Sequence, residues 1–192
     1  MIIIGITGTL GAGKGVAVSY LEKKGFVHYS ARSFILEEVR KRGLPEVRDS
    51  NVTVANELRK IHSPSYILES LYNMAAEAGG NSVLESVRTP GEIDFLKKQK
   101  SFYLLSVNAD QNERYRRVVK RNTSFDNVSF DEFQLHDSRE MEATDPNKQN
   151  IGECMRLADF QVQNDGTIEE FHVKIDAVLK EIEKREKSSM PK

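Results

Sequence analysis

The sequence predicts an α/β fold in which helices cover both faces of a parallel sheet. Short apolar runs alternate with longer segments that carry apolar residues at helical spacing, which is typical of this class. The first run, at residues 2–6, is rich in isoleucine and is followed at once by a glycine-rich turn. With 192 residues, 39% of them hydrophobic, the chain is long enough for one domain with a proper core.

Each element follows from a local pattern. Five short apolar segments are expected to be strands, at residues 2–6, 26–30, 82–86, 102–107 and 159–163. Helical spacing predicts helices at residues 16–24, 34–42, 54–61, 67–78, 112–121, 130–142 and 167–183. Gly25 ends the first helix, and a cluster of cations ends the second. The charged residues 184–192 are expected to fray.

Composition excludes several classes of protein. A net charge of -1 argues against a dedicated nucleic-acid binder, and no apolar run reaches the length of a membrane span. The single cysteine, Cys154, permits neither a disulfide nor a cysteine metal site within one chain. The four histidines lack ligand spacing. We therefore expect a cytoplasmic protein, a monomer or homodimer, with no nucleic-acid or membrane partner.

The stretch Gly8–Val18, GTLGAGKGVAV, fits the phosphate-binding pattern G-x-x-x-x-G-K-[ST], except that Gly15 replaces the hydroxyl residue. Glycines allow the backbone to approach a ligand closely, so the amides of residues 10–15 can converge on a β-phosphate. Lys14 would then bridge the β- and γ-phosphates. A tight turn with a surface lysine is the alternative. The dinucleotide pattern G-x-G-x-x-G is not matched, and no acidic residue ends the second strand.

This loop resembles that of adenylate kinases and related nucleoside monophosphate kinases, G-x-x-G-x-G-K-G-T, although Val16 replaces the threonine. The resemblance implies ATP as a cofactor, with Mg²⁺ held largely by phosphates and water. Thr7 or Thr9 remains an alternative source of a hydroxyl ligand. The implied ATP-binding residues of the loop are Gly8, Leu10, Gly11, Ala12, Gly13, Lys14, Gly15 and Val16.

Two further segments resemble the acceptor side of these kinases. Val83–Glu92 is similar to their "DGFPRT" segment, which implies that Glu85 orders the water shell of Mg²⁺ and that Arg88 grips the acceptor phosphate. A surface carboxylate and a surface pair of Arg88 with Glu92 are the alternatives.

His28–Gly43 resembles "ISTGDLLR": Ser30 matches its serine, whereas Arg32, Ser33 and Leu36 depart from it. The implied acceptor-binding residues are Ser30, Arg32 and Arg88. Arg32, Arg40 and Arg59 could also bind phosphate, or could be solvated cations.

The helix at 112–121 places Arg114, Arg117 and Arg121 on one face. It is similar to an E-R-x-x-x-R helix of the monophosphate kinases, which implies that Arg117 and Arg121 contact adenine and the transferring phosphate. A solvated basic face is the alternative. Residues 122–150 are then expected to form a short lid, in which the polar run Asp145–Asn150 has no assigned role.

The last block, Ala158–Phe171, resembles the "ADxVIxNxGT" segment of dephospho-coenzyme A kinases. The resemblance implies that Asn164, Gly166 and Thr167 cradle the adenine of ATP. A helix start with Thr167 and Glu170 as a capping box explains the same residues without a ligand.

Taken together, the blocks resemble small P-loop proteins of the adenylate kinase and dephospho-coenzyme A kinase type. This implies a P-loop NTPase fold of three layers, α/β/α, as a single domain at 1–192 with an acceptor-binding insert at about 31–80. The expected function is ATP-dependent phosphoryl transfer to a small nucleotide-like acceptor, with a nucleoside or deoxynucleoside monophosphate favoured over dephospho-coenzyme A. A nucleotide-binding regulator or slow ATPase is the alternative from a different class.

Overall fold

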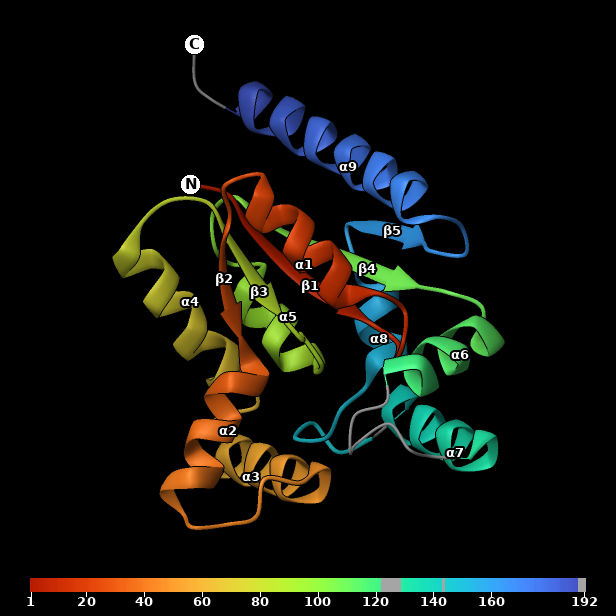
Figure 1. Cartoon of the computed structure of the whole chain (residues 1–192). Coiled ribbons are helices and arrows are strands. Elements are labelled where there is room, and N and C mark those ends of the chain that lie inside the picture. Colours follow the sequence, from red (N-terminus) through yellow and green to blue (C-terminus); the bar gives the residue numbers. More distant parts are fainter. Residues whose placement is uncertain (122–128, 143, 190–192) are drawn as a thin grey trace.

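A five-stranded parallel sheet forms the centre of the molecule (Figure 1). This computed structural model describes residues 1–121, 129–142 and 144–189. The strands lie in the order β2-β3-β1-β4-β5. They are β1 (Ile3–Gly8), β2 (Val27–Ser30), β3 (Ser82–Glu85), β4 (Phe102–Asn108) and β5 (Phe160–Gln163). The five predicted strands and their parallel arrangement are confirmed, as is the α/β class.

The central strand β1 leads into the glycine loop between two neighbours. Ile6 is in register with Glu85 of β3 on one side and with Leu105 of β4 on the other. The chain leaves β1 for β2 at one edge, whereas β4 and β5 lie on the opposite side of β1. In open α/β sheets, ligands bind where the connections diverge in this way, at the carboxyl ends of the strands.

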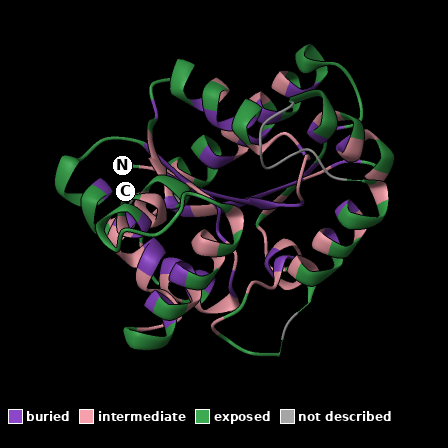
Figure 2. Cartoon of the chain, turned by 60° about the horizontal axis from the view of Figure 1, so that its bottom comes forward, coloured by how far each residue is buried: buried purple, intermediate pink, exposed green. Residues whose placement is uncertain are grey.

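Helices cover both faces of the sheet because successive strand side chains point to opposite faces. Ile4 and Ile6 pack with residues of α1 (Lys14–Lys23) and α9 (Ile168–Ser189). Ile3 points to the opposite face of the sheet from Ile4 and Ile6. It packs there with residues of α4 (Tyr66–Ala78), α5 (Pro90–Leu96) and α8 (Ile151–Arg156). Figure 2 shows the sheet as a largely buried layer between these helices. This is the three-layer arrangement that the sequence predicts.

Two helix pairs flank the carboxyl end of the sheet (Figure 1). On one side lie α2 (Ala31–Lys41) and α3 (Arg48–Ile61), within the segment expected to form the acceptor insert. On the other side lie α6 (Gln111–Arg121) and α7 (Phe130–Met141). Residues 122–128 and 143 of the expected lid lie outside the described residues. The glycine loop therefore opens between α2–α3 and α6–α7.

The structure differs from the predicted elements chiefly in four helices. The last helix continues to Ser189, because Ile182 is buried and Glu186 accepts hydrogen bonds from Ser101 and Tyr103; the predicted fraying of 184–189 is wrong. The short helices α5 and α8, of seven and six residues, are not predicted, because they are too short for a helical period to be recognised. Helix α3 begins at Arg48, six residues before the predicted start.

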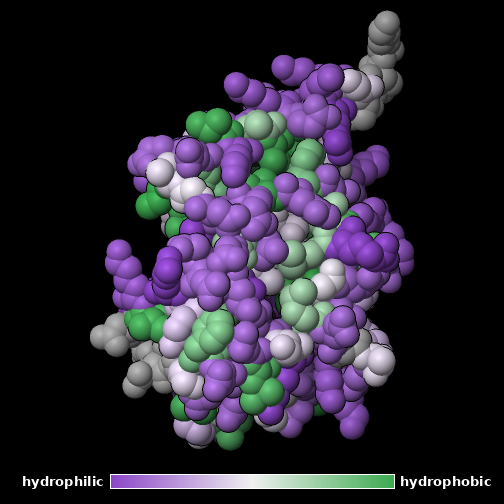
Figure 3. Space-filling view, turned by 90° about the vertical axis from the view of Figure 1, so that its right-hand side faces the viewer, coloured by the Kyte–Doolittle hydropathy of each residue, from purple (hydrophilic) through white to green (hydrophobic). Residues whose placement is uncertain are grey.

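The described surface is largely polar. None of the helices in the described ranges combines the length and apolar character that crossing a bilayer requires. On the side of the molecule seen in Figure 3, hydrophilic residues dominate and apolar residues form small, separate groups.

Candidate functional site

The glycine loop has a backbone that only glycine can supply at key positions. Gly8 has a φ of 137°, and a Cβ there would lie 1.9 Å from the carbonyl oxygen of Val107. Gly13 has a φ of 103°, and its Cβ would lie 2.4 Å from Nδ2 of Asn164. Both angles lie in a region that L side chains rarely adopt. The loop is therefore held tightly against β4 and the loop after β5.

The loop ends at the amino terminus of α1, whose first amides face it. Gly13 is the N-cap residue and has no side chain to cap the helix, and the first turn contains no acidic residue. The first amides of a helix have no carbonyl partner within the helix, and the helix dipole makes this end positive. The start of α1 is thus suited to an anionic ligand such as a phosphate.

Lys14 lies at the centre of a charged cluster. Its Nζ donates to the carbonyl oxygens of Gly8, at 2.8 Å, and Thr9, at 2.7 Å. The pKa of Lys14 is lowered to about 7, chiefly by burial and then by the Arg88 guanidinium and Arg121. Glu140 and Glu85 act in the opposite direction and offset part of this effect. These partners come from β3, the following turn, α6 and α7, so the fold gathers charges from four segments around one lysine.

Glu85 ends β3 beside the glycine loop. Its Oε2 lies 3.1 Å from Nε2 of His28 on β2, and its side chain is 22% exposed. A carboxylate oxygen at this position suits the water shell of Mg²⁺, which prefers hard oxygen ligands. The residues present therefore fit a metal that enters with the nucleotide.

The two threonines of the loop region do not offer a hydroxyl to a metal in this conformation. Thr9 Oγ1 donates to Oδ1 of Asn108 at 2.7 Å, and Thr7 is fully buried. Gly15 and Val16, where other loops carry a hydroxyl, are both exposed. A Cβ at Gly15 would meet no atom within 4 Å, so packing does not prevent a hydroxyl residue there.

The turn that carries Arg88 is held by a buried ion pair. Glu92 accepts hydrogen bonds from the backbone amides of Arg88 and Thr89 through Oε2, and from Nε and Nη2 of Arg59 through Oε1. Arg59 is only 2% exposed, so its predicted role as a phosphate partner or solvated cation is wrong. Ser86, two residues before Arg88, has a φ of 74°, a strained conformation that is often found at functional sites.

The guanidinium of Arg88 points to α7 and the loop before α8, not to Glu92. Its Nη1 donates to Gln149 Oε1 at 2.6 Å and to Glu140 Oε2 at 3.3 Å. The other oxygen of Glu140 accepts from Nη2 of Arg48 at the start of α3. Although burial raises the pKa of the Glu140 carboxyl, Arg88, Arg48 and Lys14 together hold this pKa below its ordinary value. The carboxylate of Glu140 thus bridges two cations, Arg48 on α3 and Arg88 on the turn after β3.

The three arginines predicted on one face of α6 have three different environments. Arg114 is buried and makes a bidentate pair with Asp137, at 2.7 and 2.8 Å, so a solvated basic face does not describe it. It also donates to the carbonyl oxygen of Leu10, which ties α6 and α7 to the glycine loop. Arg117 donates to the carbonyl oxygen of Asn164, at 2.8 Å. Arg121 lies near enough to Lys14 to lower its pKa.

The segment predicted to cradle adenine packs directly under the glycine loop. Asn164 is buried, and its Nδ2 donates to the carbonyl oxygen of Ala12 at 2.8 Å, so this side chain positions the loop. Thr167 and Glu170 form the predicted capping box: each backbone amide donates to the other residue's side chain. Gly166 and Thr167 are exposed, and their contact with adenine stays a prediction.

On the acceptor side, Ser30 is the N-cap of α2, and its Oγ accepts from the amide of Ser33 at 3.2 Å. Arg32 is exposed, and Arg40 pairs with Glu46 at the surface. The described residues contain no group of three or more histidine, cysteine or acidic side chains arranged to hold a metal.

Sequence reasoning assigned no role to three residues around Arg88, namely Arg48, Glu140 and Gln149, although the last two lie within the predicted lid. They lie 40, 52 and 61 positions from Arg88, in segments without a recognised motif. Only the packing of α3 and α7 toward the same turn shows that these groups meet.

The strand, glycine loop and helix at the centre of a parallel sheet, with Lys14 and Arg88 at its carboxyl end, define a P-loop NTPase fold. Residues 4–145 match the family model described as AAA domain, and the chain belongs to this family. A UPF0200 protein of Methanothermobacter thermautotrophicus is 31% identical over 192 residues, covering 98% of this chain and 95% of the relative.

Solved structures show the same fold. TT1252 from Thermus thermophilus superposes with a TM-score of 0.62 at 23% identity, over 94% of this chain and 97% of the other. Shikimate kinase from Bacteroides thetaiotaomicron superposes with a TM-score of 0.57 at 14% identity, over 93% and 98%. These similarities confirm the P-loop NTPase fold that the sequence predicts.

Proposed function

We propose that this protein is a phosphotransferase that moves the γ-phosphoryl group of ATP to a small acceptor carrying an anionic group. The proposal rests on the position of Lys14 beside Arg88. These two cations lie close enough for Arg88 to lower the pKa of the lysine. Two neighbouring cations from different segments at the carboxyl end of the sheet suit two phosphate-bearing ligands that must meet. The resemblance to P-loop kinases supports the same function.

In the proposed reaction, the amides at the start of α1 and Lys14 bind the β- and γ-phosphates, while Arg121 neutralises developing charge. Bound Mg²⁺ supplies further neutralisation of these phosphates, and Glu85 orders its water shell. Arg88 holds the anionic group of the acceptor. An acceptor oxygen forms a bond to the γ-phosphorus while the bond to the β–γ bridging oxygen breaks. ADP keeps the electron pair, and a hydroxyl acceptor loses its proton to solvent.

Several contacts of the two substrates are part of this proposal. On the ATP side, the loop residues together with Arg117, Gly166 and Thr167 would surround the nucleotide. On the acceptor side, Ser30 and Arg32 join Arg88. Nucleoside and deoxynucleoside monophosphates are the first acceptors to test, and dephospho-coenzyme A is the next, because the resemblance of residues 158–171 favours it.

A second function is favoured by two specific observations. Gly15 and Val16 lack the hydroxyl that commonly binds Mg²⁺. The guanidinium of Arg88, which is expected to bind the acceptor, already donates a hydrogen bond to Glu140. A nucleotide-binding regulator or slow ATPase would have both features.

The two functions are separated by following ATP and its products with ³¹P NMR in the presence of Mg²⁺ and a panel of acceptors. A kinase gives a phosphorylated acceptor and ADP in equal amounts, whereas a slow ATPase gives ADP and inorganic phosphate. Lys14→Ala should lower transfer by about 10²–10³, as removal of one charge-stabilising donor generally does. The matched control is Lys24→Ala, since Lys24 lies at the opposite, carboxyl-terminal end of α1 and pairs with Asp176 at the surface. ADP formation that is unaltered in Lys14→Ala would refute the assignment of the site.

A further inference from the structure

Two adjoining cavities lead away from the turn that carries Arg88. The first, of about 180 Å³, lies between α3, α7 and the loop before α8, and is lined by Arg48, Glu140 and Gln149. The second, of about 250 Å³, continues between α3 and the same loop. They share Asn56 and Lys148. Because Glu140 and Gln149 contact Arg88 directly, the two cavities form one cleft with Arg88 at its inner end.

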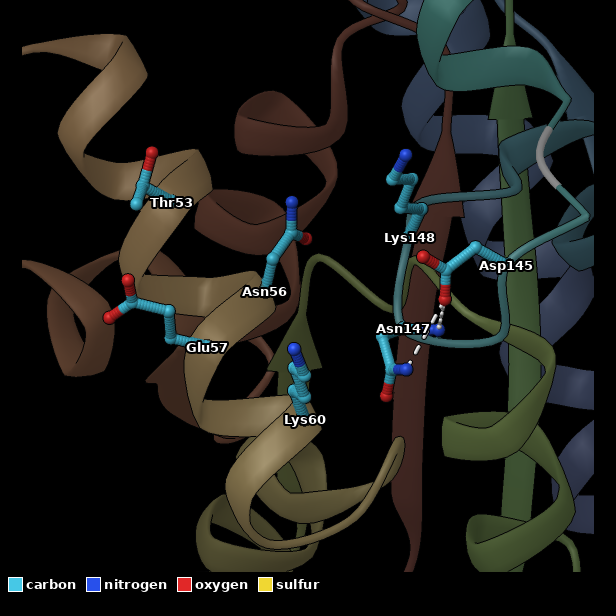
Figure 4. A pocket seen from close by; sticks show the side chains of 7 residues that line it. All are labelled: Thr53, Asn56, Glu57, Lys60, Asp145, Asn147 and Lys148. Atoms are coloured by element: carbon cyan, nitrogen blue, oxygen red, sulfur yellow. Dashed lines mark hydrogen bonds between the residues drawn. The ribbon is translucent and has the colours of Figure 1, made fainter.

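The outer cavity has polar walls on both sides. Helix α3 supplies Thr53, Asn56, Glu57 and Lys60 on one side, and the loop before α8 supplies Asp145, Asn147 and Lys148 on the other (Figure 4). Each of these side chains carries a hydroxyl, amide, carboxylate or ammonium group. Hydroxyl groups, which both donate and accept, can use every one of these partners.

Flat nucleobases are recognised chiefly by stacking on aromatic or apolar side chains. Neither cavity is lined by phenylalanine or tyrosine among the described residues, and Val52 is the aliphatic side chain they contain. His136, in the inner cavity, contributes a ring. The lining therefore favours a hydroxyl-rich ligand over a stacked base.

The loop wall of the cleft is ordered and connected to the anion-binding turn. Asn147 donates from its backbone amide, at 2.9 Å, and from Nδ2, at 3.2 Å, to Oδ1 of Asp145. The amide of Asn150 donates to the carbonyl oxygen of Arg88 at 2.8 Å. The distance between the cations at the inner end and the polar groups of the outer cavity is thus set by the fold, which is what recognition of one particular small molecule requires.

The inner end already binds an anion, the carboxylate of Glu140 between Arg48 and Arg88. We propose that the acceptor of the phosphotransferase is a small hydroxyl-rich anion, a phosphorylated sugar or a sugar acid. Its anionic group displaces Glu140 from these two arginines, and its hydroxyl groups lie against Asn56, Asn147 and Lys148. This inference rests on the proposed phosphotransfer, and it puts a hydroxyl-rich anion in place of the nucleotide acceptors that the sequence resemblance favours.

The test measures binding by calorimetry in the presence of Mg²⁺ and a non-hydrolysable ATP analogue, and transfer by ³¹P NMR with ATP. The probes are glucose 6-phosphate, gluconate, neutral glucose, AMP and CMP. We expect one of the two hydroxyl-rich anions to bind, and glucose and the nucleotides to bind at least about tenfold more weakly, the effect of roughly one charge-assisted hydrogen bond. Glucose 6-phosphate carries a phosphate and gluconate a carboxylate, so comparing their binding shows whether the acceptor is a phosphorylated sugar or a sugar acid.

Asn56→Leu removes the amide with little change of volume and should weaken the preferred anion about tenfold while leaving the affinity for the ATP analogue unchanged. Asn73→Leu is the matched control, since Asn73 is exposed on α4 and lines neither cavity. Transfer to AMP or CMP without binding of glucose 6-phosphate or gluconate overturns this inference but leaves the phosphotransferase standing. Absence of transfer to every probe overturns both. If Asn56→Leu does not weaken binding of the anion, the assignment of the acceptor to this cleft is also overturned.

Discussion

Binding of ATP should be coupled to uptake of a proton by Lys14. Burial, together with Arg88, lowers the pKa of this lysine to about 7 in the unliganded protein. At pH 8, only about one molecule in ten then carries the ammonium charge. A bound triphosphate places several negative charges against Nζ and returns its pKa toward the ordinary value, about 10.4. Each ATP bound at pH 8 should therefore take up about 0.9 proton, and at pH 6 about 0.1.

The sign of the pH dependence follows from the same values. Below pH 7 Lys14 is already charged, so the affinity for ATP does not depend on this group. Above pH 7 the proton must be taken from solvent, and the affinity should fall nearly tenfold per pH unit, or about 1.4 kcal/mol. Terminal phosphates with a pKa near 6 are fully ionised at pH 8 and contribute little there.

The assay is calorimetric titration of the protein with a non-hydrolysable ATP analogue at pH 8, in two buffers with different enthalpies of ionisation. The difference in observed heat gives the number of protons taken up. Lys14→Met should abolish the uptake, and Arg88→Ala should reduce it, because loss of this cation raises the pKa of Lys14. Lys24→Met, at the exposed end of α1, should leave it unchanged. Uptake near zero in the unaltered protein, or uptake that persists in Lys14→Met, would refute this reasoning.

Other residues of the site give three further predictions. Glu85→Ala should lower turnover far more than ATP affinity, and the free protein should show negligible Mg²⁺ affinity by titration; tight binding without nucleotide would contradict the role of Glu85. Arg88→Ala should lower transfer by about 10²–10³ but change ATP affinity less than threefold at pH 6, where Lys14 is already charged, and an equal loss of both would place Arg88 on the ATP side. Glu92→Ala should destabilise the fold by about 3–5 kcal/mol in urea unfolding, because it leaves Arg59 buried without its partner. The double change Arg59→Met with Glu92→Met should recover the part of that loss that comes from unpaired Arg59, but not the part from the amides of Arg88 and Thr89, which still lack their acceptor. An additive result would argue against the pair.

Local patterns were sufficient for most of the fold. A strand buried on both faces is a continuous apolar run, and the first run together with its glycine loop identified β1, the turn and α1. Glu85 and Arg88 were placed at the site because they follow a strand, and parallel strands end at one edge of the sheet. The short helices α5 and α8 lay below the length at which a helical period can be recognised, and the length of α9 depended on contacts with residues near 101–103.

The sequence by itself determined the parallel α/β sheet, the phosphate-binding loop and the residues that end β3, because each depends on neighbours along the chain. The tertiary structure alone decided which charges pair. Arg48 meets Glu140 across 92 positions, and Arg59 meets Glu92 across 33. Arg114 and Arg121, on the same helix face, differ because α7 packs Asp137 against Arg114, whereas Arg121 lies near Lys14. The energy of a charged side chain depends on its burial and its partners. Neither can be inferred from the spacing of residues along a single helix.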